Sequence, residues 1–195
     1  MTRECHVRFC ESAEVRSLRA THLVILSRGH AEEALTWTKV VMTKLGLTIN
    51  EAKTSLKDAR RECFDFLGYT LGPRHLPNGG RWYLGASPSK KSVQRVKMKI
   101  GELLVPSNKG AWEEVRGRLN HILRGWSAYF SYGALASAYE AVDQHVYDRA
   151  RNFLRQRHKA QGRGVGQFSR EHVYGALAVR CLRRERGRSS PWALR

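Results

Sequence analysis

The sequence lacks the apolar length that a membrane protein needs. No stretch reaches the roughly 18 consecutive apolar residues of a membrane-spanning helix, and neither a signal peptide nor a lipidation motif is present. Hydrophobic residues make up 42% of the 195 positions and aromatic residues 9%, which argues against a disordered chain. We therefore expect a folded, soluble and cytoplasmic protein with no membrane partner.

Sequence motifs of disulfide, metal-binding and catalytic sites are also scarce. Four cysteines, Cys5, Cys10, Cys63 and Cys181, form no CxxC pair, and their spacing argues against a disulfide framework. Cys5, His6 and Cys10 lack a fourth ligand at regular spacing, so no zinc site is expected. The sequence has no GxSxG segment and no glycine-rich loop that would cradle a phosphate. These absences predict no metal, no cofactor and no catalytic residue in this chain.

Acidic residues are few, and this imbalance is the strongest feature of the composition. Lys and Arg number 35 against 17 Asp and Glu, which gives a formal net charge of +18 and a pI near 10.4. Residues 90–195 hold 22 of the cations but only 8 of the acids, a net charge of +14. Self-repulsion of this size destabilises a compact fold unless an anionic partner neutralises it. A pI above about 9 is typical of nucleic-acid-binding domains, so nucleic acid is the expected partner.

The first part of the chain has the pattern of an α+β fold. Residues 1–20 show mixed charge and no clear period, so no element is expected there. A helix is predicted over residues 31–45, ended by Gly46, with an inner face of Ala34, Trp37, Val41 and Leu45. Strands are predicted at 23–26, 47–49 and 63–69, and a hairpin over 70–84 turns at Pro77-Asn78-Gly79-Gly80. The strand at 23–26 has no obvious sheet neighbour.

Beyond Ser87-Pro88-Ser89 the pattern is purely helical. Ser89 is predicted to cap a helix over residues 90–104. Further helices are predicted over 111–131 and 135–159, and a shorter one over 170–182. The expected inner positions of the first and third helices are Val93, Val96, Ile100, Leu103, Tyr139, Val142, Val146 and Phe153.

The segment around residues 119–133 combines an apolar stripe with polar flanks. The stripe consists of Leu119, Ile122, Leu123, Trp126 and Phe130, and Arg118, Arg124 and Tyr129 fall on its flanks. Two interpretations stay open, a well-packed core helix and a rigid surface positioned for nucleic acid. The aromatic residues are assigned mainly to packing, with the hydroxyl of Tyr129 expected to point outward.

Four segments, in order, are similar to parts of a known family. LGLTINEAKT (45–54) and FDFLGY (64–69) resemble the motifs that end a reverse-transcriptase palm, and NHILRGWSAYFSYG (120–133) and RHKAQGRG (157–164) resemble the maturase-specific or thumb domain. Together they resemble the C-terminal part of the reverse transcriptase/maturase encoded by bacterial group II introns. The resemblance implies a partial palm over residues 21–86 and an all-α three-helix thumb over 87–182, with a poorly matched segment at 1–20 and a basic tail at 183–195.

One departure from the family bears on catalysis. Arg19-Ala20-Thr21-His22 stands where the family has Tyr-Ala-Asp-Asp, so both Mg²⁺-binding aspartates are absent. Neither threonine nor histidine supplies the hard anionic oxygen that two-metal phosphoryl transfer requires. We therefore expect a truncated RNA-directed DNA polymerase that is inactive and binds no Mg²⁺, although the full-length family uses Mg²⁺. Lys53 matches a palm lysine that faces the nucleotide site, and we interpret it either as a remnant of that site or as a surface lysine.

The resemblance implies an RNA-binding maturase module of a mobile group II intron, which assists folding and splicing of intron RNA. The expected partner is intron RNA or an RNA/DNA duplex. The alternatives are a reverse-transcriptase fragment that needs a complementing fragment for activity, and an inactive relic. RNA helices are recognised through backbone and shape, so cations on rigid helices and an aromatic for stacking are required. The candidate RNA-binding residues, for each of which a solvated face is the alternative, are Lys90, Lys91, Arg95, Lys97, Lys99, Arg118, Arg124, Tyr129, Arg151, Arg155, Arg157, Lys159 and Arg163.

A cluster of acids and two helical histidines receive structural interpretations. Asp58, Glu62 and Asp65 lie close in sequence to Lys57, Arg60 and Arg61, and surface ion pairs are preferred over a catalytic carboxylate pair. His121 and His145 have no matched partner in the sequence and are assigned no ligand role.

Overall fold

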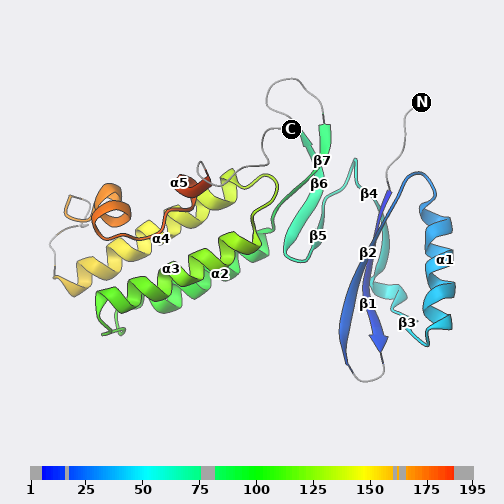
Figure 1. Cartoon of the computed structure of the whole chain (residues 1–195), viewed down its shortest axis with the longest axis horizontal. Helices are drawn as coiled ribbons and strands as arrows, with labels where there is room; N and C mark the ends of the chain where they lie inside the picture. The colour runs from blue at the N-terminus through cyan, green and yellow to red at the C-terminus, as the bar shows by residue number, and fades with distance from the viewer. Residues whose placement is uncertain (1–5, 16–17, 76–81, 160–161, 163–165, 187–195) are drawn as a thin grey trace. The chain divides into compact units, whose positions relative to one another are not determined.

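The computed structural model describes residues 6–15, 18–75, 82–159, 162 and 166–186 (Figure 1). The chain divides into two compact units, Met1–Ala86 and Ser87–Arg195. The first unit is built mainly from strands and the second is helical. The predicted α+β fold class is thus confirmed.

The first unit begins with an antiparallel pair, β1 (His6–Val15) and β2 (Leu18–Ser27). The opposite edge of β1 pairs with two strands. Residues 6–10 of β1 pair with β4 (Thr54–Asp58), and residues 13–14 pair with β3 (Thr48–Ile49). The expectation of no element within residues 1–20 is therefore wrong, and the strand predicted at 23–26 has β1 as its neighbour. Apolar residues alternate at 7, 9, 13 and 15, but register shifts between Glu11 and Val15 disturb the pairing and obscure the period.

A single helix, α1 (Ala31–Lys44), precedes β3. Leu47 N–H bonds to Met42 O at 2.9 Å, Gly46 N–H bonds to Thr43 O at 3.0 Å, and Gly46 has φ +70°, which together form a Schellman motif. The predicted helix and its stop are confirmed, but its predicted inner face is only partly correct, because Ala34 and Val41 are half-buried whereas Trp37 and Leu45 are exposed. Ala31 and Thr38 are buried, whereas Trp37 is 70% and Leu45 65% exposed. Trp37 lies at the edge of the helix face that contains Ala31 and Thr38, and Leu45 follows the last helical residue.

A second sheet of the first unit contains β5 (Phe64–Phe66), β6 (Tyr69–His75) and β7 (Trp82–Pro88), in that order. It follows the short helix η1 (Glu51–Lys53) and strand β4 along the chain. The single strand predicted over 63–69 is wrong, because Leu67 and Gly68 have positive φ values of 47° and 81° and turn the chain between β5 and β6. The turn predicted at residues 77–80 lies outside the described residues.

The second unit is organised around α2 (Lys90–Leu103), α3 (Trp112–Tyr129) and α4 (Ala136–Arg157), which lie side by side in Figure 1. The hydroxyl of Ser89 accepts the backbone N–H of Ser92 at 3.2 Å, so the predicted cap is confirmed. A single apolar cluster fills the space between the helices and includes most of the predicted inner positions, with Ile100, Leu119 and Leu123 wholly buried. The 3.6-residue period therefore identified the core of this unit correctly.

The remaining elements are a π-helical turn at His172–Ala176 and the short helix α5 (Leu182–Arg186). The single helix predicted over 170–182 is wrong, because Ala178 adopts φ +50° and ends the helical path. Side chains from neighbouring helices hold this segment. Asn120 on α3 bonds to the backbone of Ala178 and Arg180, and Asp143 on α4 bonds to the backbone of Leu182.

Candidate nucleic-acid interface

Helix α2 presents the densest group of exposed cations. The amphipathic pattern turns Val96, Ile100 and Leu103 into the core, so the positions between them face solvent. Lys97 is half-buried, and the exposed candidates on α2 are Lys90, Lys91, Arg95 and Lys99. None of these five side chains makes an ion pair or side-chain hydrogen bond with another described residue. Their charges are therefore balanced by no acid within the described part of the chain.

Helix α3 carries two further predicted cations and the aromatic cluster. Arg118 and Arg124 are exposed, while Trp126 packs on Phe130 and Tyr139 with ring centroids 5.0 and 5.8 Å apart. Tyr139 donates its hydroxyl to Phe130 O at 2.8 Å, which fixes the end of α3 on α4. Tyr129 is 56% exposed and stands edge-on to Phe130. The aromatic stripe is therefore mainly core, with Tyr129 left accessible for contact.

The arginines near the end of α4 differ from those of α2, because they bond within the protein. Arg151 lies 3.4 Å from the carboxylate of Asp148. Arg155 donates to Gly162 O at 3.0 Å, and Arg157 donates to Gly110 O at 2.6 Å. Of the two remaining candidates of this region, Lys159 is exposed and Arg163 lies outside the described residues. Part of the predicted basic cluster thus ties the ends of helices to nearby loops.

A groove between α2 and α4 brings together three basic residues whose proximity the sequence does not predict. Lys97, His145 and Arg149 all line this groove, which has a volume of about 600 Å³. His145 was assigned no partner, yet its Nε2 lies 3.0 Å from Lys97 O. Burial, together with the positive charges of Arg149 and Lys97, lowers the pKa of His145, against the hydrogen bond to Lys97 O and the charge of Asp148. The i, i+4 spacing of His145 and Arg149 was the available signal.

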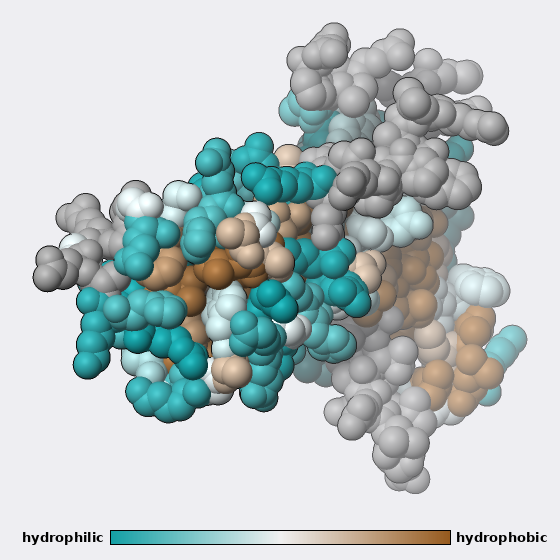
Figure 2. Space-filling view, turned by 60° about the vertical axis from the view of Figure 1, so that its left-hand side comes forward, coloured by the Kyte–Doolittle hydropathy of each residue, from teal (hydrophilic) through white to brown (hydrophobic). Residues whose placement is uncertain are grey.

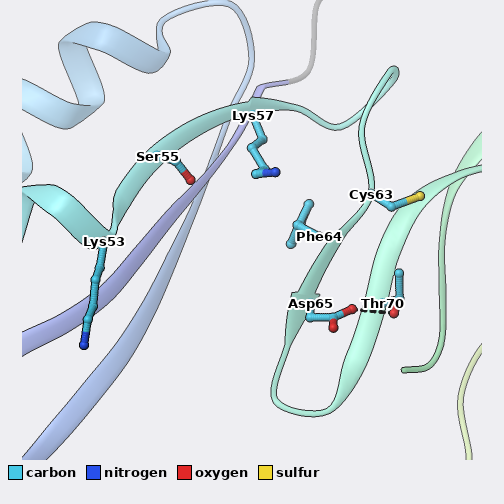
Figure 3. Close-up of a pocket in the computed structure, with 7 residues that line it drawn as sticks. All are labelled: Lys53, Ser55, Lys57, Cys63, Phe64, Asp65 and Thr70. Carbon is cyan, nitrogen blue, oxygen red and sulfur yellow. Dashed lines mark hydrogen bonds between the residues drawn. The ribbon is translucent and has the colours of Figure 1, made fainter. Parts of the chain in front are cut away.

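The first unit contains a separate pocket of about 420 Å³ around Lys53 (Figure 3). Lys53 and Lys57 come from η1 and β4, whereas Asp65 and Thr70 come from the β5–β6 hairpin. Thr70 donates its hydroxyl to Asp65 at 2.5 Å, so this carboxylate already has a partner. The pocket supplies one acid and two cations, which suits an anionic group better than a metal ion.

The neighbouring acids form the expected surface ion pairs. Lys57 lies 3.3 Å from Glu62, and Arg61 lies 3.5 Å from Asp58. In the described part of the chain, no group of three or more His, Cys, Asp or Glu side chains is placed to hold a metal ion. The side chains of Cys63 and Cys181 are free thiols. The pairs Lys57–Glu62 and Arg61–Asp58 confirm the interpretation of this cluster as surface ion pairs.

The surface of the second unit is mixed in polarity. Figure 2 shows hydrophilic side chains over much of its near face, bordering a strip of hydrophobic ones. Across the described residues, no helix combines the length and apolar character needed to cross a membrane. The face of this unit that is visible in Figure 2 is thus largely polar.

Comparison with known proteins identifies the helical region. The sequence model of the family described as group II intron, maturase-specific domain matches residues 93–175. This range runs from the first turn of α2 into the π-helical turn and contains the whole of α3 and α4. Comparison with curated proteins found no significant match. The helical C-terminal region of this chain is therefore similar, over residues 93–175, to the maturase-specific domain of group II introns.

Proposed function

We propose that this chain is an RNA-binding module that assists group II intron RNA in reaching its splicing-competent fold. The observation that carries the proposal is the set of exposed cations on α2 and α3, which have no acidic partner among the described residues. They project from a rigid helical core of the maturase-specific type. Intron RNA is the polyanion that such a domain implies.

The physical chemistry of RNA recognition supports this assignment. The A-form major groove is too deep and narrow for side chains, so proteins contact the backbone and the shape of the helix. Lysines and arginines on a rigid helix place positive charge at defined spacing along such a backbone. The half-exposed ring of Tyr129 adds a surface on which an unpaired base can stack.

The experiment that tests this proposal is a salt titration of binding. A fluorescently labelled group II intron RNA is titrated with the full chain between 50 and 500 mM salt, and the affinity is followed by anisotropy. If several phosphates are neutralised, the logarithm of affinity falls linearly with the logarithm of salt, by about 0.7–0.9 per phosphate. Equal affinities at the two ends of this range would refute RNA binding by these cations.

We further propose that the first unit is the last part of a reverse-transcriptase palm, which retains structure but not catalysis. The two motifs that resemble a palm lie between the end of α1 and the start of β4 and on the β5–β6 hairpin, and Lys53 lines the pocket beside this hairpin. With arginine, alanine, threonine and histidine at positions 19–22, no carboxylate pair is available there for Mg²⁺. A primer-extension assay with Mg²⁺ should yield no DNA product, and template-dependent synthesis by the purified chain would refute the assignment.

A further inference from the structure

The groove between α2 and α4 is built from both helices. Lys97 lies on α2 and Arg149 on α4, and both side chains line the same space of about 600 Å³. Gly101 lies next to the guanidinium, since a Cβ atom there would be in van der Waals contact with Nη2 of Arg149 at 3.5 Å. Glu102 is the only acid among the described residues that line the groove. The groove therefore has a net positive lining.

His145, which also lines the groove, is held in one tautomer. Nε2 of His145 lies 3.0 Å from Lys97 O, and a carbonyl oxygen can only accept, so Nε2 carries the hydrogen. The neutral ring therefore has Nδ1 as an acceptor, and protonation turns Nδ1 into a second donor. An anion in the groove would favour this protonation, because it offsets the charges of Lys97 and Arg149 that disfavour it.

The two cations of the groove differ from the other arginines near the end of α4 in their hydrogen bonds and ion pairs. Arg151 pairs with Asp148, and Arg155 and Arg157 donate to backbone carbonyls. The side chains of Lys97 and Arg149 make no ion pair or hydrogen bond with another described residue. Two such cations on the walls of a groove are suited to an external anion, since charge-assisted hydrogen bonds to phosphate are stronger than neutral ones.

We propose that this groove binds a phosphodiester group of the RNA backbone, with Lys97 and Arg149 as cationic contacts and His145 as a proton-dependent third donor. The inference rests on the proposed RNA-binding function and names a site for it. It places Arg149 and His145, which were absent from the predicted contacts, beside Lys97 in one anion-binding site.

The first test removes charge from the groove. Full-chain Lys97→Gln and Arg149→Gln variants are compared with Lys109→Gln and Arg184→Gln, which remove one charge from exposed positions of the same unit. With a labelled 16-base-pair RNA duplex as probe, each groove variant should lose roughly tenfold in affinity and reduce the salt slope by about 1. The controls should change affinity by less than about twofold.

The second test fills the groove without changing its charge. Gly101→Leu places a side chain against the guanidinium of Arg149, whereas Gly117→Leu adds the same group on α3 with no atom within 4 Å of the new Cβ. Both changes favour the helix, so urea denaturation should show both variants folded. RNA affinity should fall for Gly101→Leu alone, and equal affinities for these two variants would overturn the proposal.

A third readout follows the histidine itself. The pKa of His145, measured by NMR on the full chain, should rise when the RNA duplex is added, and the rise should be the same in Lys109→Gln as in the wild type. An unchanged pKa in the presence of saturating duplex would overturn the role of His145. Inorganic phosphate at millimolar concentration should fail to displace the duplex, and displacement would assign the groove to free phosphate instead.

The outcomes separate this inference from the function on which it rests. If the wild-type chain binds no RNA, the proposed function fails. If it binds with a steep salt dependence but the groove variants match their controls, the proposed function stands and the groove assignment is overturned.

Discussion

The carboxylate of Asp143 on α4 accepts the backbone N–H of Leu182 at 3.0 Å, 39 residues further along the chain. The same carboxylate accepts the N–H of Arg183 at 3.1 Å and the thiol of Cys181 at 3.3 Å. Asp143 is only 2% exposed, and three donors compensate for the burial of its charge. Burial raises the pKa of the Cys181 thiol, which keeps it protonated as a donor. This one side chain therefore anchors the start of α5 to α4.

Replacing Asp143 should destabilise the second unit substantially. Asp143→Ala leaves the N–H groups of Leu182 and Arg183 without their acceptor, and hydrogen bonds to a charged group contribute roughly 1.5–3 kcal/mol. We expect a loss of about 2–3 kcal/mol in the free energy of unfolding, measured by urea denaturation. Asp148→Ala is the control, since the side chain of this acid is 41% exposed and its partners among the described residues are Arg151 and Gln144, so its loss should cost less than about 1 kcal/mol. Equal losses in the two variants would contradict the anchoring role.

The side chain of Asn120 should hold the segment before α5 through two bonds. Its Nδ2 donates to Ala178 O at 3.0 Å, and its Oδ1 accepts the N–H of Arg180 at 2.8 Å. Asn120→Ala should lower the free energy of unfolding by about 1–2 kcal/mol and speed hydrogen exchange at the amide of Arg180. Asn152→Ala on the exposed side of α4 is the matched control. Unchanged exchange at Arg180 in the Asn120 variant would refute the assignment.

The turn between β5 and β6 should be improved by substitution. Leu67 is 60% exposed and has φ +47°, next to Gly68 at φ +81°. A left-handed conformation costs most residues roughly 1–2 kcal/mol, and asparagine followed by glycine is the preferred pair for such hairpin turns. Leu67→Asn should therefore slow hydrogen exchange within residues 64–75 by a factor that corresponds to about 1 kcal/mol. Leu67→Ala removes the same side chain without this preference, and an equal gain from alanine would refute the conformational explanation.

His145 should make the stability of the second unit depend on pH. Its pKa is lowered in the folded chain, first by burial and then by Arg149 and Lys97, while the bond to Lys97 O and the charge of Asp148 oppose the shift. Below the ordinary pKa of about 6.5 the unfolded chain therefore binds more protons than the folded one, so stability falls as pH decreases through this window. His145→Gln should show a smaller decrease between pH 7.5 and 5.5 in urea denaturation. A parallel decrease in both proteins would exclude His145 as its source.

Local regularities of the sequence determined the main helices, the N-cap of α2 and the end of α1. Ser89 before Lys90 is followed by apolar residues at 93, 96, 100 and 103, so capping and periodicity agree on α2 without any distant contact. Gly46 likewise ends α1 because it adopts φ +70° at little cost. The same periodicity separated core from surface on α3 and so selected Arg118 and Arg124 as exposed cations.

Contacts between distant segments were decided by the tertiary structure alone. Nothing local in the sequence pairs β1 with β4, brings Asp143 to Leu182, or places Arg149 beside Gly101, because a hydrogen bond or charge contact depends on distance in space. For the same reason, composition could count the cations of α4 but could not tell that Arg155 and Arg157 bond internally while Arg149 lines a groove. The sequence by itself determined the four long helices, α1 to α4, and the cationic character of the chain. Only packing decided which cations remain available to a polyanion.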